Sequence, residues 1–314
     1  MKQRTQELTQ LIRSISFAGR ILILSIGILF LISSSVSDKK IFSNTPLYAA
    51  TINRSEILNL KLSELISKCP GTPSIKILFL NSGYEMEFRS GKVVRAASVI
   101  KLPICVAVMS LCRKGKGSLP EPISLVEEDR TSGSGILRHR RFNRDYTVEE
   151  LIKLMILESD NTATNALIRR FGLEEIQNEF EKAGLIKTKL KHRILEASED
   201  NPISSSEIVD LLSAIADTSQ ESSIHPDDRR WIFDLLKQTS PGARLGRYLP
   251  DEAKIAHKTG TLRREVHDAG IIETDSNKII VSALIEKAKS RKEAERWLGR
   301  LGRLICETKN DLTY

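Results

Sequence analysis

The sequence predicts an α/β protein of the α+β, two-lobe kind, in which both chain ends build one antiparallel sheet flanked by helices and the middle forms an all-helical lobe. Three observations predict this fold. Strand-like alternation occurs near both ends of the folded region, helical spacing fills the stretch between, and 40% of the 314 residues are apolar. That apolar fraction is enough for a packed core.

Residues 1–53 have the pattern of an export segment and a linker. Lys2, Arg4, Arg13 and Arg20 precede an apolar run over 21–36 without charged residues, the layout of a secretory signal or an uncleaved membrane anchor. The run is shorter than the ~20 residues that span a bilayer comfortably. Positive charge ahead of it predicts that the remainder is translocated. We therefore expect one domain over 54–314, exported to the periplasm or extracellular space, secreted or anchored.

The first elements of this domain follow from local patterns. Leucines at helical spacing behind a serine N-cap predict a helix over 55–68. Alternating β-formers around an Asn-Ser-Gly turn predict a hairpin over 74–90. An apolar helix over 96–112 comes next, and Ser98 lies in its first turn.

The stretch from 103 to 231 is almost entirely helical in pattern. Two helices over 146–172 are interrupted at 159–161, and a capping-box serine opens a helix over 204–216. The last elements are strands over 253–260, 268–274 and 278–285 and a helix over 292–306. We expect the functional site in the crevice between sheet and lobe.

Charge and cysteine usage exclude several classes of function. The net charge is +8, but the basic groups do not alternate with aromatic residues, which make up 5% of the chain, so no nucleic-acid partner is expected. The histidines and cysteines lack metal-ligand spacing, and we expect no cofactor and a monomer. Buried free thiols are the favoured interpretation of Cys69, Cys105, Cys112 and Cys306, and a Cys69–Cys306 bridge is the alternative.

Three short motifs occur in one order at predicted element boundaries. They are S-x-x-K at 98–101, S-D-N at 159–161 and K-T-G at 258–260. Each motif is weak evidence alone, but the ordered set is hard to obtain by chance.

The first motif has the residue types of nucleophilic catalysis. Residues three apart share a helix face, so Lys101 should lie against Ser98 Oγ. A serine hydroxyl needs a neighbouring base, and a lysine can serve when burial or another cation lowers its pKa. Backbone N–H groups at the helix N-terminus would face the developing oxyanion.

The other two motifs supply the remaining groups. Ser159 can pass a proton to a leaving nitrogen, and Asn161 can orient Lys101 and bind a substrate amide. Lys258 suits a substrate carboxylate and the proton relay. The same strand offers Thr259, Gly260 and, through its N–H, a second oxyanion donor at Thr261.

Neighbouring polar residues have simpler expected roles. Asp160 is expected to cap the helix that follows it. His257 and His267 are expected to pack or to form hydrogen bonds. Arg263 and Arg264 are candidates to meet a substrate carboxylate.

With these motifs the sequence resembles class A β-lactamases and their penicillin-binding relatives. The loop over 132–137, the central stretch over 151–168 and the closing segments HKTGT and HDAGII resemble theirs too, so the likeness covers about 62–305. The resemblance implies a β-lactamase/transpeptidase fold and an acyl-enzyme on Ser98. It also implies a small β-lactam or peptidoglycan-like substrate as partner.

One departure leaves the outcome of acylation open. The resemblance implies an E-x-x-L-N loop whose glutamate activates the deacylating water, but the stretch over 188–207 lacks it and has Ile194 at the expected position. Glu196, two residues on, is the candidate base of a shifted loop, or else a solvated charge. The candidate functions are a β-lactamase-like hydrolase, a D-alanyl-D-alanine carboxypeptidase or esterase, and a penicillin-binding module without turnover.

Overall fold

The computed structural model describes residues 54–217, 222–275 and 277–307. The predicted export segment and its boundary at residue 53 lie outside these ranges. Within them, no helix combines the length and the apolar character that a membrane crossing requires.

One antiparallel sheet of five strands is the centre of the domain, with the strand order β2-β1-β9-β8-β7. Strand β1 pairs with β9, so that Ile75 lies opposite Ala283, and the two ends of the domain meet in neighbouring strands as predicted. The strands are β1 (Thr72–Phe79), β2 (Tyr84–Phe88), β7 (Lys254–Thr261), β8 (Val266–Glu273) and β9 (Lys278–Glu286).

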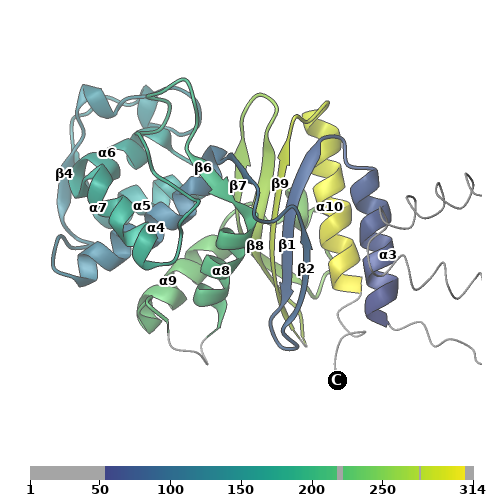
Figure 1. Ribbon diagram of the computed structural model, residues 1–314. Helices are drawn as coiled ribbons and strands as arrows, with labels where there is room; N and C mark the ends of the chain where they lie inside the picture. The colour runs from purple at the N-terminus through teal and green to yellow at the C-terminus, as the bar shows by residue number, and fades with distance from the viewer. Residues whose placement is uncertain (1–53, 218–221, 276, 308–314) are drawn as a thin grey trace, which may run out of the picture. The chain divides into compact units, whose positions relative to one another are not determined.

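Helices cover both faces of this sheet (Figure 1). On one face lie α3 (Arg54–Ser67) and α10 (Arg291–Glu307), where the fully buried Trp297 donates its indole N–H to Leu65 O at 2.8 Å. The other face carries α8 (Ser205–Ala216) and α9 (Pro226–Lys237). Ser204 caps α8 by accepting from the Glu207 N–H, because that amide has no partner within the helix.

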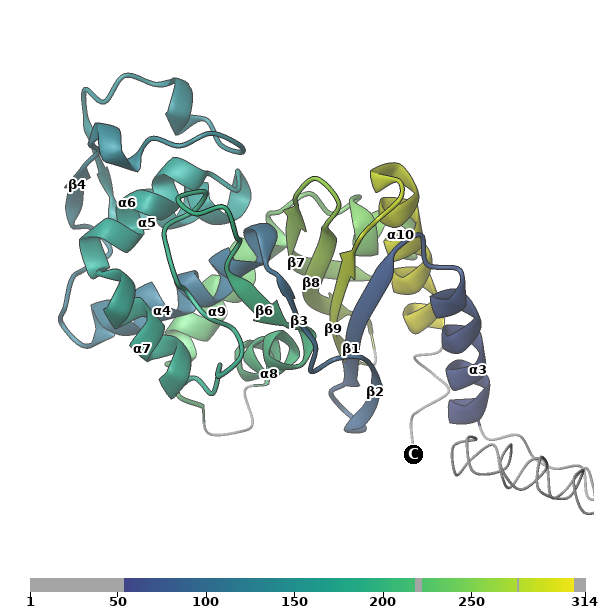
Figure 2. The ribbon, with the colours of Figure 1, turned by 45° about the horizontal axis from the view of Figure 1, so that its top comes forward.

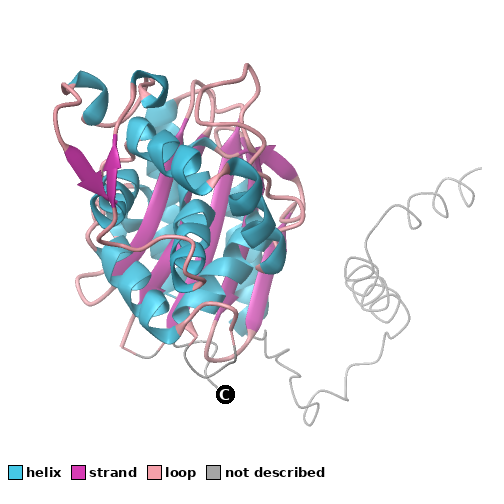
Figure 3. Cartoon of the chain, turned by 90° about the vertical axis from the view of Figure 1, so that its left-hand side faces the viewer, coloured by secondary structure: helices cyan, strands magenta, loops and turns pink. Residues whose placement is uncertain are grey.

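The helical lobe stands beside the sheet and shares one apolar core with α8 and α9. Figure 3 views the domain with helices in front of the sheet. A capping box between Thr147 and Glu150 begins one of its helices. Its helices are α4 (Lys101–Arg113), α5 (Val148–Leu157), α6 (Asn161–Phe171) and α7 (Leu173–Lys182).

Two short ribbons were not predicted, and three of their four strands lie in the stretch over 103–231 predicted as almost wholly helical. Strand β3 (Val93–Arg95) pairs with β6 (Pro202–Ser204), and β4 (Pro122–Ser124) pairs with β5 (Asp145–Thr147). Three-residue strands are too short to show a period of two, so the sequence pattern missed them. Figure 2 shows β3 and β6 between the lobe and the main sheet.

All four cysteines are free thiols, so Cys69 and Cys306 do not form the bridge that the sequence left open. Cys105 and Cys306 are buried. Burial is the main reason that the pKa of the Cys105 thiol is raised to about 12, which keeps this thiol protonated and unreactive.

Candidate active site

Ser98 lies in the 3₁₀ turn η1 (Ala97–Ile100), which leads directly into α4. The preceding residue, Ala97, has a left-handed φ of 47°, a conformation that costs about 1–3 kcal/mol for a residue with a side chain. Its N–H donates to Asp200 Oδ2 at 2.6 Å. Asp200 therefore holds the turn that presents Ser98, although 103 residues separate the two partners of this bond.

Strand β7 passes very close to this turn at Gly260. A Cβ atom at position 260 would lie 3.0 Å from Val99 Cγ2 and 3.2 Å from the Ser98 nitrogen. Glycine permits this approach because it has no side chain. The third motif thus brings the strand that ends at Thr261 alongside Ser98.

Lys101 is completely buried beneath Ser98. Its Nζ donates to Ser159 O at 2.5 Å and to Asn161 Oδ1 at 2.6 Å, and it lies 3.4 Å from Ser98 Oγ. Burial above all, and then the charge of Lys258, hold the pKa of Lys101 well below its usual value. A neutral amine has two N–H groups and one lone pair, so the two short bonds leave the lone pair for the serine hydroxyl.

Ser159 joins the two lysines. It lies between α5 and α6 with a φ of 52°, and its Oγ is 3.4 Å from Lys101 Nζ and 3.1 Å from Lys258 Nζ. Burial, followed by repulsion from Arg244, lowers the pKa of Lys258 to about 7. The site thus contains a continuous path for protons between Ser98, Lys101, Ser159 and Lys258.

The two residues that follow Ser159 fix this arrangement. Asn161 accepts from Lys101 and donates through Nδ2 to Ser132 O at 2.9 Å. Asp160 accepts from Ala163 N at 2.9 Å as the N-cap of α6 and from Leu137 N at 2.8 Å. Asn161 therefore orients the lysine, and Asp160 is the structural cap that the sequence predicts.

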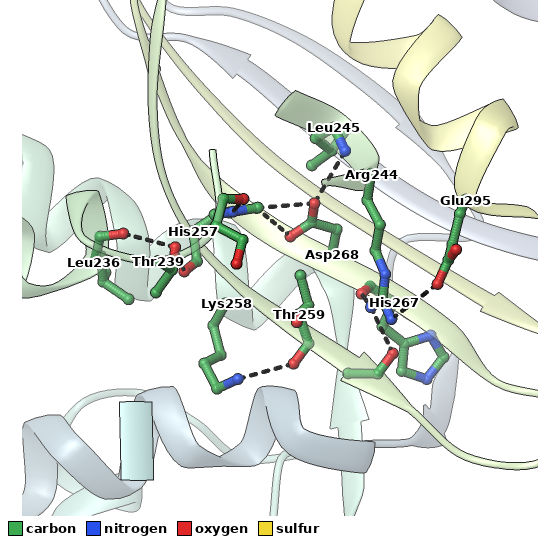
Figure 4. A network of polar contacts seen from close by, with 12 residues as sticks. Leu236, Thr239, Arg244, Leu245, His257, Lys258, Thr259, His267, Asp268 and Glu295 are labelled. Carbon is green, nitrogen blue, oxygen red and sulfur yellow. Dashed lines mark hydrogen bonds and ion pairs between the residues drawn. The ribbon is translucent and has the colours of Figure 1, made fainter. Parts of the chain in front are cut away.

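Arg244 is a buried member of the site that sequence reasoning missed (Figure 4). It lies in the 3₁₀ helix η4 (Arg244–Tyr248) with a φ of 47°, outside any motif. Its guanidinium donates to Gly260 O at 2.8 Å, to His267 O and to Thr261 Oγ1. Arg244 therefore fixes the end of β7 and the Thr261 hydroxyl.

The two arginines considered for the substrate carboxylate lie just beyond the end of β7. Arg263 and Arg264 are exposed in the turn between β7 and β8, and Arg264 donates to Lys287 O at 3.3 Å. No signal in the sequence distinguished Arg244 from them, because its burial depends on the packing of η4 against the sheet and α10.

Both histidines near the third motif form hydrogen bonds with other buried groups (Figure 4). His257 Nδ1 lies 2.9 Å from Asp268 Oδ1, and its Nε2 lies 3.0 Å from Ser240 O. His267 Nδ1 accepts from Ile285 N at 3.1 Å, so its other ring nitrogen donates to Arg95 O at 2.8 Å. Across the ranges that the structure describes, no group of three or more His, Cys, Asp or Glu could hold a metal ion.

The loop over 188–201 places three successive residues in different surroundings. Ile194 is buried, and Asn165 holds its backbone, accepting from its N–H at 2.8 Å and donating to its C=O at 3.3 Å. Glu196 is half exposed and forms an ion pair with Arg193 at 3.1 Å, so it lies outside the hydrogen-bonded cluster around Ser98.

Leu195, between them, is 46% exposed and lies beside Gly133. Its φ is 60°, and a Cβ on Gly133 would lie 3.3 Å from Leu195 Cδ1 and 2.6 Å from Asn161 Nδ2. Gly133 thus has an alkyl side chain on one side and Asn161 on the other. No pattern in the sequence indicated the left-handed backbone at Leu195.

The buried Lys101 follows Ser98 by three residues, and Ser159 joins it to Lys258 on the sheet. In this two-lobe fold, that arrangement defines a penicillin-recognising serine hydrolase. The chain belongs to the β-lactamase enzyme family, whose family model matches residues 57–308. It is thus a hydrolase of the β-lactamase type, and the sequence-based family and fold assignments are confirmed.

Comparisons with individual proteins agree with this assignment. The chain is 22% identical to β-lactamase VEB-1 of Pseudomonas aeruginosa over 257 residues, which are 76% of this chain and 86% of the relative. It is 27% identical to a β-lactamase of Streptomyces albus G over 244 residues; the match covers 72% of this chain and 76% of the relative. The solved structure of PBP-A matches with a TM-score of 0.75 and 26% identity over 81% of this chain and 96% of that one. A mutant of PBP-A, solved as an acyl-enzyme complex with penicillin G, matches with the same values.

Proposed function

We propose that Ser98 is acylated by β-lactams and that the resulting ester is hydrolysed slowly. One observation carries this proposal: the buried Lys101 uses two donors on Ser159 O and Asn161 Oδ1 and lies 3.4 Å from both Ser98 Oγ and Ser159 Oγ. A neutral lysine in this position is a general base for the serine. The similarity to the penicillin G acyl-enzyme of a PBP-A mutant supports the same chemistry.

The acylation step follows from the positions of these groups. Lys101 Nζ takes the proton of Ser98 Oγ as that oxygen bonds to the lactam carbonyl carbon. The oxyanion forms beside the N–H groups of Ser98 and Thr261. The C–N bond then breaks, Ser159 gives its proton to the lactam nitrogen, and Lys101 returns a proton to Ser159. Lys258, 3.1 Å from Ser159 Oγ, attracts the substrate carboxylate together with Thr259.

Deacylation needs a water molecule activated by a base, and Asp200, the carboxylate of this loop beside Ser98, is engaged with the Ala97 N–H at 2.6 Å. Leu195 lies beside Gly133, whereas Glu196 is held by Arg193 at 3.1 Å. We therefore place the protein among slow, penicillin-binding members of this class A-like group. A peptidoglycan D-alanyl-D-alanine carboxypeptidase or esterase is the second candidate, because acylation by such substrates uses the same residues.

The segment over 1–53 supports an exported site of action. Basic residues ahead of an apolar run favour translocation of the catalytic domain. We propose that the enzyme acts outside the cytoplasmic membrane, where peptidoglycan-like substrates and β-lactams are encountered.

Intact-mass spectrometry after one dose of benzylpenicillin tests this function. The expected result is a mass increase of one penicillin that persists for many minutes and is absent in the Ser98→Ala variant. Rapid decay of the adduct with accumulation of hydrolysed drug would instead indicate an efficient β-lactamase. The absence of any adduct would refute acylation by β-lactams, and release of D-alanine from a peptide tests the second candidate.

A further inference from the structure

A cavity of about 390 Å³ adjoins the catalytic groups on the side of η4 and α10. Ser159, Lys258 and Thr259 belong to its wall, so it is continuous with the proposed substrate site. The rest of the wall includes Arg244, Arg247, Arg291 and Glu295. The cavity therefore extends the substrate site toward a group of arginines.

Two of these arginines have guanidinium groups that a ligand can reach. Arg247 is exposed and donates through Nε to Tyr248 OH at 3.2 Å, and no carboxylate of the described residues forms an ion pair with it. The side chain of Arg291 is 65% exposed and pairs with Glu295 at 2.9 Å through Nε alone. Both side chains thus retain donors that can turn toward the cavity.

Arg244 differs from these two residues. It is buried, and it donates to two backbone carbonyls and the Thr261 hydroxyl. Its charge adds to the positive potential of the cavity, but its N–H groups are engaged with acceptors of the protein. Arg247 and Arg291 are therefore the groups of this wall with donors left for an anion.

The charges of the wall favour an anion. The basic groups are Arg244, Arg247, Arg291 and Lys258, and the acidic groups are Glu158 and Glu295. His257 also lines the cavity. The arginines alone exceed the carboxylates, so the excess is positive in either state of the lysine. A concave wall with excess positive charge concentrates its field on a bound anion.

We propose that this cavity is an anion-binding extension of the substrate site, in which Arg247 and Arg291 bind a second acidic group of the substrate. The inference rests on the proposed function, in which Lys258 and Thr259 receive the carboxylate next to the lactam ring. A carboxylate or sulfonate further along the molecule then reaches the two guanidinium groups. Planar guanidinium forks bind such groups through paired hydrogen bonds.

Two cephalosporins provide a matched test. Cefonicid and cefamandole have the same acyl side chain and differ at the tetrazole of the position-3 substituent, which is sulfomethylated in cefonicid and methylated in cefamandole. We expect the second-order rate constant of Ser98 acylation to be roughly 10-fold larger for cefonicid at low salt, because the arginines attract the sulfonate. The ratio should fall toward one in the R247Q/R291Q double variant and at high salt. Arg300→Gln is the control variant. It removes one charge from the exposed face of α10, the helix that also contains Arg291, but outside the cavity, and it should keep the ratio.

The outcomes separate this inference from the proposed function. Equal rate constants for the two drugs, or a cefonicid preference that survives in R247Q/R291Q, would overturn the anion subsite while acylation by cefamandole still upholds the proposed function. Failure of both drugs to acylate Ser98 would overturn the proposed function. In that case, equilibrium binding of both drugs to the Ser98→Ala protein tests whether the anion subsite exists. Tighter binding of cefonicid that is lost in the Arg247 and Arg291 variants supports it, and equal binding refutes it.

Discussion

Lys101 and Lys258 approach the same atom, Ser159 Oγ, with their ammonium nitrogens 3.4 Å and 3.1 Å away. A neighbouring cation raises the free energy of a buried lysine's charged form. Burial is the main cause of the lowered pKa of both lysines; the charge of Lys258 adds to it at Lys101, and the charge of Arg244 adds to it at Lys258, whose pKa falls to about 7. In the proposed mechanism Lys101 acts as the neutral base and Lys258 as the cation.

The rate of acylation should therefore follow a bell-shaped dependence on pH. It rises as Lys101 loses its proton and becomes a base, and it falls above about pH 7 as Lys258 loses the charge that attracts the substrate carboxylate. The measurement is the second-order rate constant for a fluorescent penicillin between pH 5 and pH 10. In Lys258→Arg the guanidinium remains charged, so the alkaline fall should disappear. An alkaline fall that is unchanged in this variant would show that another group causes it.

Ser98→Ala should abolish covalent labelling by fluorescent penicillin and leave the fold intact. The change removes the nucleophilic oxygen and introduces a residue that favours helix. Labelling on a denaturing gel and the thermal unfolding temperature check the two parts of this prediction. Ser223→Ala is the matched control, since Ser223 is exposed and lies in the cavity wall between α4, α7 and α9, away from the site. Labelling that survives in Ser98→Ala contradicts the assignment of the nucleophile.

Leu195→Glu should shorten the lifetime of the penicillin ester. The substitution places a carboxylate beside Gly133, and a positioned general base contributes about 100-fold or more to the rate. Time-resolved intact-mass spectra of the adduct measure the lifetime. Leu195→Gln is the neutral control and should keep the slow rate. Glu196→Gln should also leave the lifetime unchanged, because Glu196 is paired with Arg193; a longer lifetime in this variant would identify Glu196 as the base.

His257→Leu should destabilise the domain by about 3–5 kcal/mol, because it leaves the carboxylate of Asp268 buried without its cationic partner. Urea denaturation at pH 6 measures the difference. Replacing both residues, as His257→Leu with Asp268→Asn, should recover part of the loss, since no unpaired charge remains. A double variant no more stable than His257→Leu would argue against the charge as the cause.

The His257–Asp268 pair also predicts how the stability difference between wild type and His257→Leu depends on pH. Burial is the largest single effect and opposes the charged imidazole, but the attraction and hydrogen bond of Asp268, together with the hydrogen bond to Ser240 O, outweigh it and raise the pKa of His257 above 6.5. A raised pKa in the folded state gives a contribution that is complete below pH 6.5 and is lost as the pH rises through the folded-state value. The difference between wild type and His257→Leu should therefore become smaller at high pH.

Residues close together in the sequence were the predictable part of the site. Ser98 and Lys101 share a helical face, and Asp160 caps α6, because both relationships depend on the local geometry of a helix. Alternation over 253–285 likewise indicated strands, and the pairing of β1 with β9 followed from placing strand patterns at both ends of the domain.

Contacts between distant residues were not predictable in this way. Asp200 holds Ala97, Arg244 holds the end of β7, and Leu195 lies beside Gly133. Ala97, Leu195 and Arg244 have positive φ angles, which sequence patterns do not indicate for residues other than glycine.

Patterns along the chain were enough to predict the family, the strands at both ends of the domain with helices between them, and the residues of the proposed acylation chemistry. These depend on short motifs and on periodicities of a few residues, which local hydrogen bonding and burial dictate. The packing of distant elements fixed how close β7 lies to Ser98, which arginine is buried and which residue of the loop over 188–201 lies beside Gly133. Those features depend on how separate elements pack, because a loop turns a side chain inward or outward according to contacts with residues far away in the chain.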